Sequence, residues 1–462
     1  MADTSMPGIA DLAQAYRNET TTPREAVDAC LARIEAHNDK IGAFELIFAD
    51  RARQAADAAG LAMKAGHRLG PFHGVPFALK DLIDVEGEIT TGGANVYADR
   101  VAKRSAVIAQ RLIAGGGILI GKTKTVEVAY GPWGTNTQRG TPWNPWDMQT
   151  HRAPGGSSSG SGAGVASGFM ACAVGTDTGG SVRIPAAFCG LTGLKVTEGH
   201  LPLDGIVPLS HTLDTPGPMC RSALDAAIMF QTMEGRAPGA IETALAEGQG
   251  LYGAMATPVE GLSIGVMTAE DRAFIDPAVN ARFEEATKRL ANLGARLVPF
   301  PLPVGVDAMR FSVATIIGAE GYYYHGEHYD NPDNAGRMDE HVKARIIDGQ
   351  PLPTSAYIKA LRQRLEHKAL FLDAMRGLAA VVTPTVPIKA PIVEEIDQTT
   401  APSQLTRMVN HLGFCALSTP MGLVDGLPAG LQIMCRGGEE AMALRLGAAF
   451  EKDAGLLGLP AL

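Results

Sequence analysis

Apolar residues recur at helical spacing in several stretches of this chain. In residues 22–37, a Thr-Pro pair precedes apolar side chains three and four positions apart, which predicts an amphipathic helix. A second helix is predicted over residues 105–114, followed by a short buried strand over 118–121. Further along, a helix over 283–293 precedes a strand over 296–300. Helices that alternate with strands predict an α/β protein built on a sheet.

Glycine and serine crowd the segment 150–193, and a flexible linker has a similar composition. This segment also carries Val165, Phe169 and Met170, which a solvated linker would not contain. We therefore expect it inside the fold, where glycine allows two backbones to approach closely. Residues 237–261 show little pattern and are the expected place for a variable excursion. Otherwise, residues 1–462 are expected to form one domain.

Composition narrows the function classes. The 462 residues are 46% apolar and 19% charged, with a net charge of −9 and no run dense in Lys or Arg. This charge disfavours nucleic acid or an anionic membrane as the main partner and favours a small molecule. No run approaches the roughly 18 apolar residues that a membrane span needs, and residues 1–11 lack the pattern of a secretory signal. A homodimer is compatible with the sequence.

The six cysteines are scattered, mostly within apolar stretches, and have neither C-x-x-C nor metal-ligand spacing. They are typical of reduced core residues in a cytoplasmic protein. We expect no metal and no organic cofactor.

Residues 116–123 match the phosphate-binding P-loop expression letter for letter. A phosphate cradle needs a loop at the four variable positions, so that backbone N–H groups point inward. Residues 118–120 are instead an Ile-Leu-Ile triplet, which favours a buried strand. We therefore interpret this match as a strand that ends at a polar turn.

Residues 156–160 formally fit the G-x-S-x-G nucleophile elbow, with Ser158 at the nucleophile position. That elbow directly follows a strand, whereas residues 147–154 are polar and contain proline. Several histidines lie downstream and keep the pattern formally open, but the context disfavours it.

A third pattern joins Lys80, Ser157 and Ser181. Lys80 follows the apolar run Val75-Pro-Phe-Ala-Leu79, and lysine is among the residues least often buried. Lys80 is either a surface charge at the end of a strand or a buried amine. Burial lowers the pKa of lysine, and a neutral amine can activate a serine without histidine.

These segments resemble the amidase signature family. Ser157 precedes Ser181 by 24 positions, the family's usual interval, and Lys80 lies in the family's G-V-P-x-x-x-K-D segment. The resemblance extends from about Ala10 to Ala454. It implies a single α/β/α domain around a large mixed sheet.

The resemblance also implies roles for individual residues. Ser181 is the expected nucleophile, Ser157 the proton relay and Lys80 the base. The expected oxyanion hole consists of backbone N–H groups at Thr178, Gly179 and Gly180. The resemblance further implies a cis peptide bond between Gly156 and Ser157. Asp177 and Arg183 are expected to form an ion pair that stiffens the loop around Ser181, and the alternative is an ion pair on the surface.

The substrate is less well defined. Tyr130, Trp133 and Trp143 lie in segments that often border the family's acyl pocket, which indicates a small aryl or apolar carboxylic amide, unless they are core aromatics. Trp143 departs from the family pattern and indicates an altered pocket or surface, and Ser159 departs from it by adding a side chain to the serine loop. One rival is the A subunit of glutamyl-tRNA amidotransferase, although residues 214–218 read Asp-Thr-Pro-Gly-Pro where that protein usually has Asp-Gln-Ile-Gly-Pro. Another is a non-catalytic binding protein on the same fold.

Overall fold

One mixed sheet runs through the molecule in the computed structural model, which describes residues 6–462. Its strand order is β1-β3-β2-β4-β6-β5-β10-β11-β9-β7-β8. The strands are β1 (Phe44–Ile47), β2 (Pro76–Lys80), β3 (Ile118–Thr123), β4 (Cys172–Asp177), β5 (Thr192–Lys195), β6 (Thr215–Cys220), β7 (Ser263–Met267), β8 (Arg296–Phe300), β9 (Ala380–Pro384), β10 (Cys415–Val424) and β11 (Leu427–Cys435). Strand β2 runs parallel to β3 and β4, so the carboxyl ends of β2 and β4 meet at one edge.

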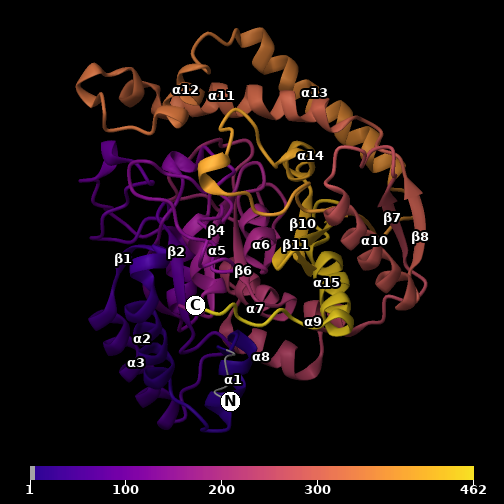
Figure 1. The fold of residues 1–462 in the computed structure, drawn as a ribbon. Coiled ribbons are helices and arrows are strands. Elements are labelled where there is room, and N and C mark those ends of the chain that lie inside the picture. The colour runs from indigo at the N-terminus through magenta and orange to yellow at the C-terminus, as the bar shows by residue number, and fades with distance from the viewer. Residues whose placement is uncertain (1–5) are drawn as a thin grey trace.

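Helices cover both faces of the sheet, as the resemblance implied. Helices α4, α7, α10 and α15 pack together on one face, and α5 and α6 pack on the other, while α11, α12 and α13 form a long arm across the top of Figure 1. The helices are α1 (Ile9–Arg17), α2 (Pro23–Ile41), α3 (Ala49–Lys64), α4 (Val107–Ala114), α5 (Ser159–Ala166), α6 (Arg183–Cys189), α7 (Ala223–Glu234), α8 (Pro238–Glu247), α9 (Gly250–Ala256), α10 (Pro277–Asn292), α11 (Val306–Asp330), α12 (Glu340–Ile347), α13 (Thr354–Ala374), α14 (Gln404–Leu412) and α15 (Glu440–Ala454).

The predicted α/β alternation is confirmed, and local capping chemistry explains the helix boundaries. Helix α2 begins after Thr22, whose Oγ1 accepts from the backbone N–H of Glu25 while the Glu25 carboxylate accepts from that of Thr22. Strand β8 has the predicted bounds. Helix α10 begins earlier than predicted, because Asp276 caps it and Pro277 occupies its first position.

The Gly/Ser-rich segment is buried, so the linker interpretation is excluded. Helix α5 lies within it, and a Cβ added at Gly160 would lie 2.2 Å from the carbonyl oxygen of Ala43. The glycine there permits the close backbone approach that the sequence predicted.

Residues 118–123, which include most of the P-loop match, form the buried strand β3. Lys122 Nζ lies 2.6 Å from Asp81 Oδ1, and both side chains are buried. This lysine is occupied by an internal ion pair.

The segment 237–261 contains two short helices, α8 and α9, and α9 packs against α15. Within residues 6–462, no helix combines the length and the apolar character that a membrane span requires.

Candidate active site

Lys80 stands at the carboxyl end of β2 and is fully buried. Its Nζ lies 2.7 Å from Ser157 Oγ and 2.8 Å from Thr176 Oγ1. Thr176 comes from β4, the parallel neighbour of β2, so both side chains reach the same edge of the sheet. Lys80 is therefore a buried amine, and the alternative that it is a surface charge at the end of a strand is excluded.

Burial dominates the electrostatics of this amine. It lowers the pKa of Lys80 from 10.5 to about 7, although the negative charges of Asp214 and Asp177 act in the opposite direction. About half of the molecules therefore carry a neutral Lys80 at neutral pH, which allows this side chain to accept a proton.

Ser157 lies in the loop before α5 and follows a cis peptide bond from Gly156. Its carbonyl oxygen accepts from the backbone N–H of Val126 and from the hydroxyl of Thr125, each at 3.1 Å. The next residue, Ser158, donates its hydroxyl to the Thr176 carbonyl at 3.3 Å and is fully buried. Ser158 therefore has a structural position, and the nucleophile-elbow interpretation loses its support.

Ser181 lies between β4 and α6 and has 7% of its surface exposed. Its carbonyl oxygen accepts from the backbone N–H of Ser158 at 3.3 Å, which ties the two serine segments together. Its side chain lines a pocket, and within residues 6–462 its Oγ has no hydrogen-bond partner. Ser181 is thus the serine of this group that a molecule in the pocket can reach.

Asp177 and Arg183 form a fully buried ion pair. Arg183 Nε donates to Asp177 Oδ2 at 3.0 Å and its Nη2 to Oδ1 at 2.9 Å, while Nη1 donates to Gln432 at 2.6 Å. Burial alone would raise the pKa of Asp177, but the charge and hydrogen bonds of Arg183 outweigh it and lower that pKa. The pair is internal to the nucleophile loop, so the surface-pair alternative is excluded.

The backbone of residues 178–181 is held from two sides. Gly180 N–H donates to Asp177 Oδ1 at 2.8 Å, and the Gly179 carbonyl accepts from the Thr406 hydroxyl at 2.8 Å. Gly180 has a φ of +128°, and a Cβ there would lie 2.3 Å from Thr406 Oγ1, so the position requires glycine. In the part of the chain from 6 to 462, the N–H groups of Gly179 and Ser181 have no acceptor.

The pocket in front of Ser181 is open to solvent and has a cavity volume of about 110 Å³. Besides Thr178, Gly179 and Ser181, its lining includes three arginines, Arg310, Arg345 and Arg407. They come from α11, α12 and α14 respectively. Among the described residues, no aspartate or glutamate lines it.

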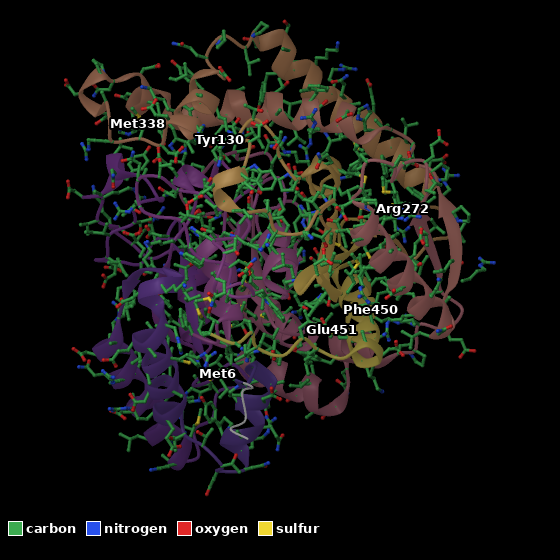
Figure 2. All side chains as sticks on the ribbon, viewed as in Figure 1. Met6, Tyr130, Arg272, Met338, Phe450 and Glu451 are labelled. Atoms are coloured by element: carbon green, nitrogen blue, oxygen red, sulfur yellow. The ribbon has the colours of Figure 1, made fainter. Side chains whose placement is uncertain are left out.

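The three predicted pocket aromatics occupy different surroundings. Tyr130 lines the pocket and lies beneath the α11 arm in Figure 2. Trp133 is buried in an apolar cluster outside the lining, and its indole N–H donates to the carbonyl of Thr400 at 3.1 Å. Trp143 does not line the pocket either, because it stacks on His151 with 4.4 Å between ring centres.

Comparisons with known proteins show the family of this chain. A family model described as Amidase matches residues 25–444. The chain belongs to the Amidase family. The amidase signature resemblance and its fold are confirmed. A 2-amino-5-chloromuconic acid deaminase from Comamonas testosteroni is 35% identical, and the alignment covers 98% of each chain.

Two further members of the family are similar over nearly their whole length. The A subunit of glutamyl-tRNA(Gln) amidotransferase from Anaeromyxobacter dehalogenans is 33% identical, over 98% of this chain and 97% of that protein. The solved structure of the native peptide amidase from Stenotrophomonas maltophilia superimposes with a TM-score of 0.84 at 27% identity, over 98% of each chain. The protein is an amide hydrolase of the Amidase family.

Several residues of this Amidase site were not predicted from the sequence. Thr176 contacts the lysine, and Gln432 completes the arginine's hydrogen bonds. The three arginines of the pocket were missed as well, since they are up to 97 positions apart and belong to no shared motif. Thr176 lies beside Lys80 because β2 and β4 pair in parallel, and the sequence carries no signal for that pairing.

Proposed function

We propose that the protein hydrolyses a small carboxylic amide through an acyl-enzyme on Ser181, with Ser157 and Lys80 transferring the proton. The observation that carries this proposal is the 2.7 Å distance between Lys80 Nζ and Ser157 Oγ, combined with the complete burial of that amine. A buried lysine with a pKa of about 7 is a suitable base near neutral pH.

In the proposed reaction, Ser181 Oγ attacks the amide carbonyl carbon. The Ser181 proton passes to Ser157 Oγ while the Ser157 proton passes to Lys80 Nζ. When the tetrahedral intermediate collapses, the C–N bond breaks and the proton returns along the same path to the leaving nitrogen. Water then attacks the ester in the same way and releases the acid.

We propose that backbone N–H groups of Thr178, Gly179 and Ser181 stabilise the oxyanion. The N–H of Gly179 and that of Ser181 have no acceptor within residues 6–462, so they are available to a substrate. Gly180, which the resemblance also placed in this hole, donates to Asp177 instead. We propose that Gly180 holds the nucleophile loop in place through this hydrogen bond.

A stand-alone hydrolase is the first choice for the overall function, with residues 1–462 acting as one domain in the cytoplasm. The similarity to the A subunit of glutamyl-tRNA(Gln) amidotransferase supports a second candidate, release of ammonia from glutamine for a partner protein. The Asp-Thr-Pro-Gly-Pro sequence at 214–218 favours the first. A high rate on small amides by the purified chain alone, with little activity on glutamine, distinguishes them.

The experiment that tests the mechanism combines labelling and kinetics. Ser181→Ala should abolish labelling by a fluorophosphonate and lower kcat by about 10³-fold or more, and Ser157→Ala should lower kcat by a similar factor. Ser167→Ala is the matched control, because Ser167 is buried at the end of α5, away from the pocket lining. Labelling that persists in Ser181→Ala, or near-normal turnover in Ser157→Ala, would show that another group activates the nucleophile.

A further inference from the structure

Three positive charges converge on the pocket in front of Ser181. Arg310, Arg345 and Arg407 line it from three different helices, and among residues 6–462 its lining contains no aspartate or glutamate. Like charges close together in a partly desolvated space repel one another, and each loses part of its hydration. Such an arrangement favours the binding of an anion that compensates the charges.

Arg407 is the arginine most closely tied to the nucleophile loop. Its side chain lies along Gly179, where an added Cβ would be 3.3 Å from Arg407 Cγ and 3.5 Å from its Nε. Its neighbours on α14 anchor the helix to this loop, because Thr406 donates to the Gly179 carbonyl and Asn410 donates to Asp177 Oδ1 at 2.9 Å. The position of Arg407 relative to Ser181 is therefore set by the same contacts that shape the loop.

Arg407 has no compensating partner in the part of the chain that the structure describes. It forms no ion pair, and its buried Nε has no hydrogen-bond acceptor. Burial and the charges of Arg310 and Arg345 lower the pKa of Arg407 to about 10, although Tyr130 acts against them. It is still protonated at neutral pH.

Arg345 is held in place but not neutralised. Its Nη1 donates to the Tyr130 carbonyl at 2.8 Å and its Nη2 to the Gln398 carbonyl at 2.7 Å. Carbonyl oxygens orient a guanidinium group without cancelling its charge. Arg310 differs, because its Nε donates at 3.2 Å to the largely exposed Asp307. Within residues 6–462, neither Arg345 nor Arg407 forms an ion pair, although the charge of Asp339 partly offsets the effect of burial on the pKa of Arg345.

We propose that the substrate carries a carboxylate, which Arg407 and Arg345 bind while the scissile amide lies at Ser181. A planar guanidinium group matches a carboxylate with two parallel hydrogen bonds, and the anion supplies the charge compensation that the pocket lacks. The cavity volume of about 110 Å³ accommodates a small group. The substrate class is therefore the monoamide of a small dicarboxylic acid, an assignment that rests on the proposed Ser181 mechanism.

This class differs from the aryl or apolar amide that the three aromatic residues indicated. Of those three, Tyr130 lines the pocket, while Trp133 and Trp143 do not. The charged groups outnumber the aromatic ones in the lining, and a wholly apolar substrate would leave the Arg407 guanidinium group desolvated without a partner.

The test compares matched substrates that differ in one charge. Malonamate, succinamate, glutaramate and adipamate are each measured beside the corresponding diamide, in which a neutral amide replaces the carboxylate, with ammonia release as the readout. For the best chain length, the wild-type kcat/KM should be at least about tenfold higher for the monoamide, as expected for a charge-assisted contact. Arg407→Gln should remove that preference through a higher KM for the monoamide, so that the kcat/KM values for the monoamide and the diamide become equal within about twofold, as expected when a binding contact is lost.

Two further variants make the test specific to the guanidinium group. Arg407→Lys keeps the charge but loses the planar pair of donors, so it should recover only part of the preference. Arg376→Gln is the control, because Arg376 is an exposed arginine paired with Asp373 at 2.9 Å and does not line the pocket. It should retain the full preference.

Binding to the Ser181→Ala protein, measured by calorimetry, separates this proposal from the mechanism. The best monoamide should bind at least about tenfold more tightly than its diamide, and the added Arg407→Gln change should abolish the difference. Equal affinities, no measurable binding of any monoamide, or an equal loss for both substrates in Arg407→Gln would overturn the carboxylate proposal and leave Ser181 catalysis intact. Retained turnover in Ser181→Ala would instead overturn the proposed function.

Discussion

The pH dependence of hydrolysis reports the protonation state of Lys80. With its ordinary pKa of 10.5, about 1 in 3000 of these amines would be neutral at pH 7, whereas a pKa of about 7 makes about half of them neutral. Burial thus increases the population of the active base by about 10³-fold. Below that pKa the amine is protonated and cannot accept the serine proton, so kcat/KM should fall about tenfold for each pH unit.

The assay measures kcat/KM between about pH 5 and pH 9 on one activated ester and one amide. For the wild type, kcat/KM should rise with pH through about 7 and then level off. Lys80→Ala should lose this rise, the acidic limb of the pH profile, together with most of the rate. Lys80→Arg should fail equally, because a guanidinium group stays protonated at every accessible pH.

Histidine variants are the control for this prediction. His73, His151 and His211 are not among the residues that line the pocket, so replacing each one should leave the acidic limb in place. Wild-type turnover in Lys80→Arg, or loss of the limb in a single histidine variant, would refute the lysine base.

Two further predictions concern the nucleophile loop. Arg183→Met leaves the buried Asp177 carboxylate without its cation, so the free energy of unfolding from chemical denaturation should fall by about 3–5 kcal/mol; an unchanged midpoint would contradict the structural role of the pair. Gly180→Ala combines a φ of +128° with a Cβ 2.3 Å from Thr406 Oγ1, so both kcat and stability should fall, the latter by more than about 1–3 kcal/mol. Gly248→Ala is the matched control, since its φ is also positive but no atom lies within 4 Å, and an equal loss in both variants would show that the contact with Thr406 is unimportant.

Elements that depend on local pattern could be predicted from the sequence. Strand β8 has the predicted bounds, because a short apolar run directly after a helix leaves few other structures. Helix α10 was predicted with a late start, since its first turn is set by the cap at Asp276 and by Pro277 rather than by apolar spacing. The order of the eleven strands could not be read from these patterns, because pairing depends on contacts between distant segments.

The sequence by itself determined the three candidate catalytic residues of the site. Lys80, Ser157 and Ser181 stand in three recognisable motifs, and a buried lysine is unusual enough to indicate chemistry. Only the tertiary structure placed the Lys80 amine within 2.8 Å of both Ser157 and Thr176. The parallel pairing of β2 and β4 brings Thr176 beside Lys80, and the loop before α5 brings Ser157 to the same place.

The pocket was decided almost entirely by tertiary structure. Trp143 lies in a segment that was expected to border the pocket, yet it stacks on His151 outside the pocket. Arg407 lies more than 200 positions after Ser181 in the sequence, yet its side chain lies against Gly179 in the nucleophile loop. A pattern along the chain relates residues within one helix or strand, since its period reflects the geometry of that element. The charge of a pocket is the sum over side chains from several elements, and only the packing of α11, α12 and α14 decides which of them meet.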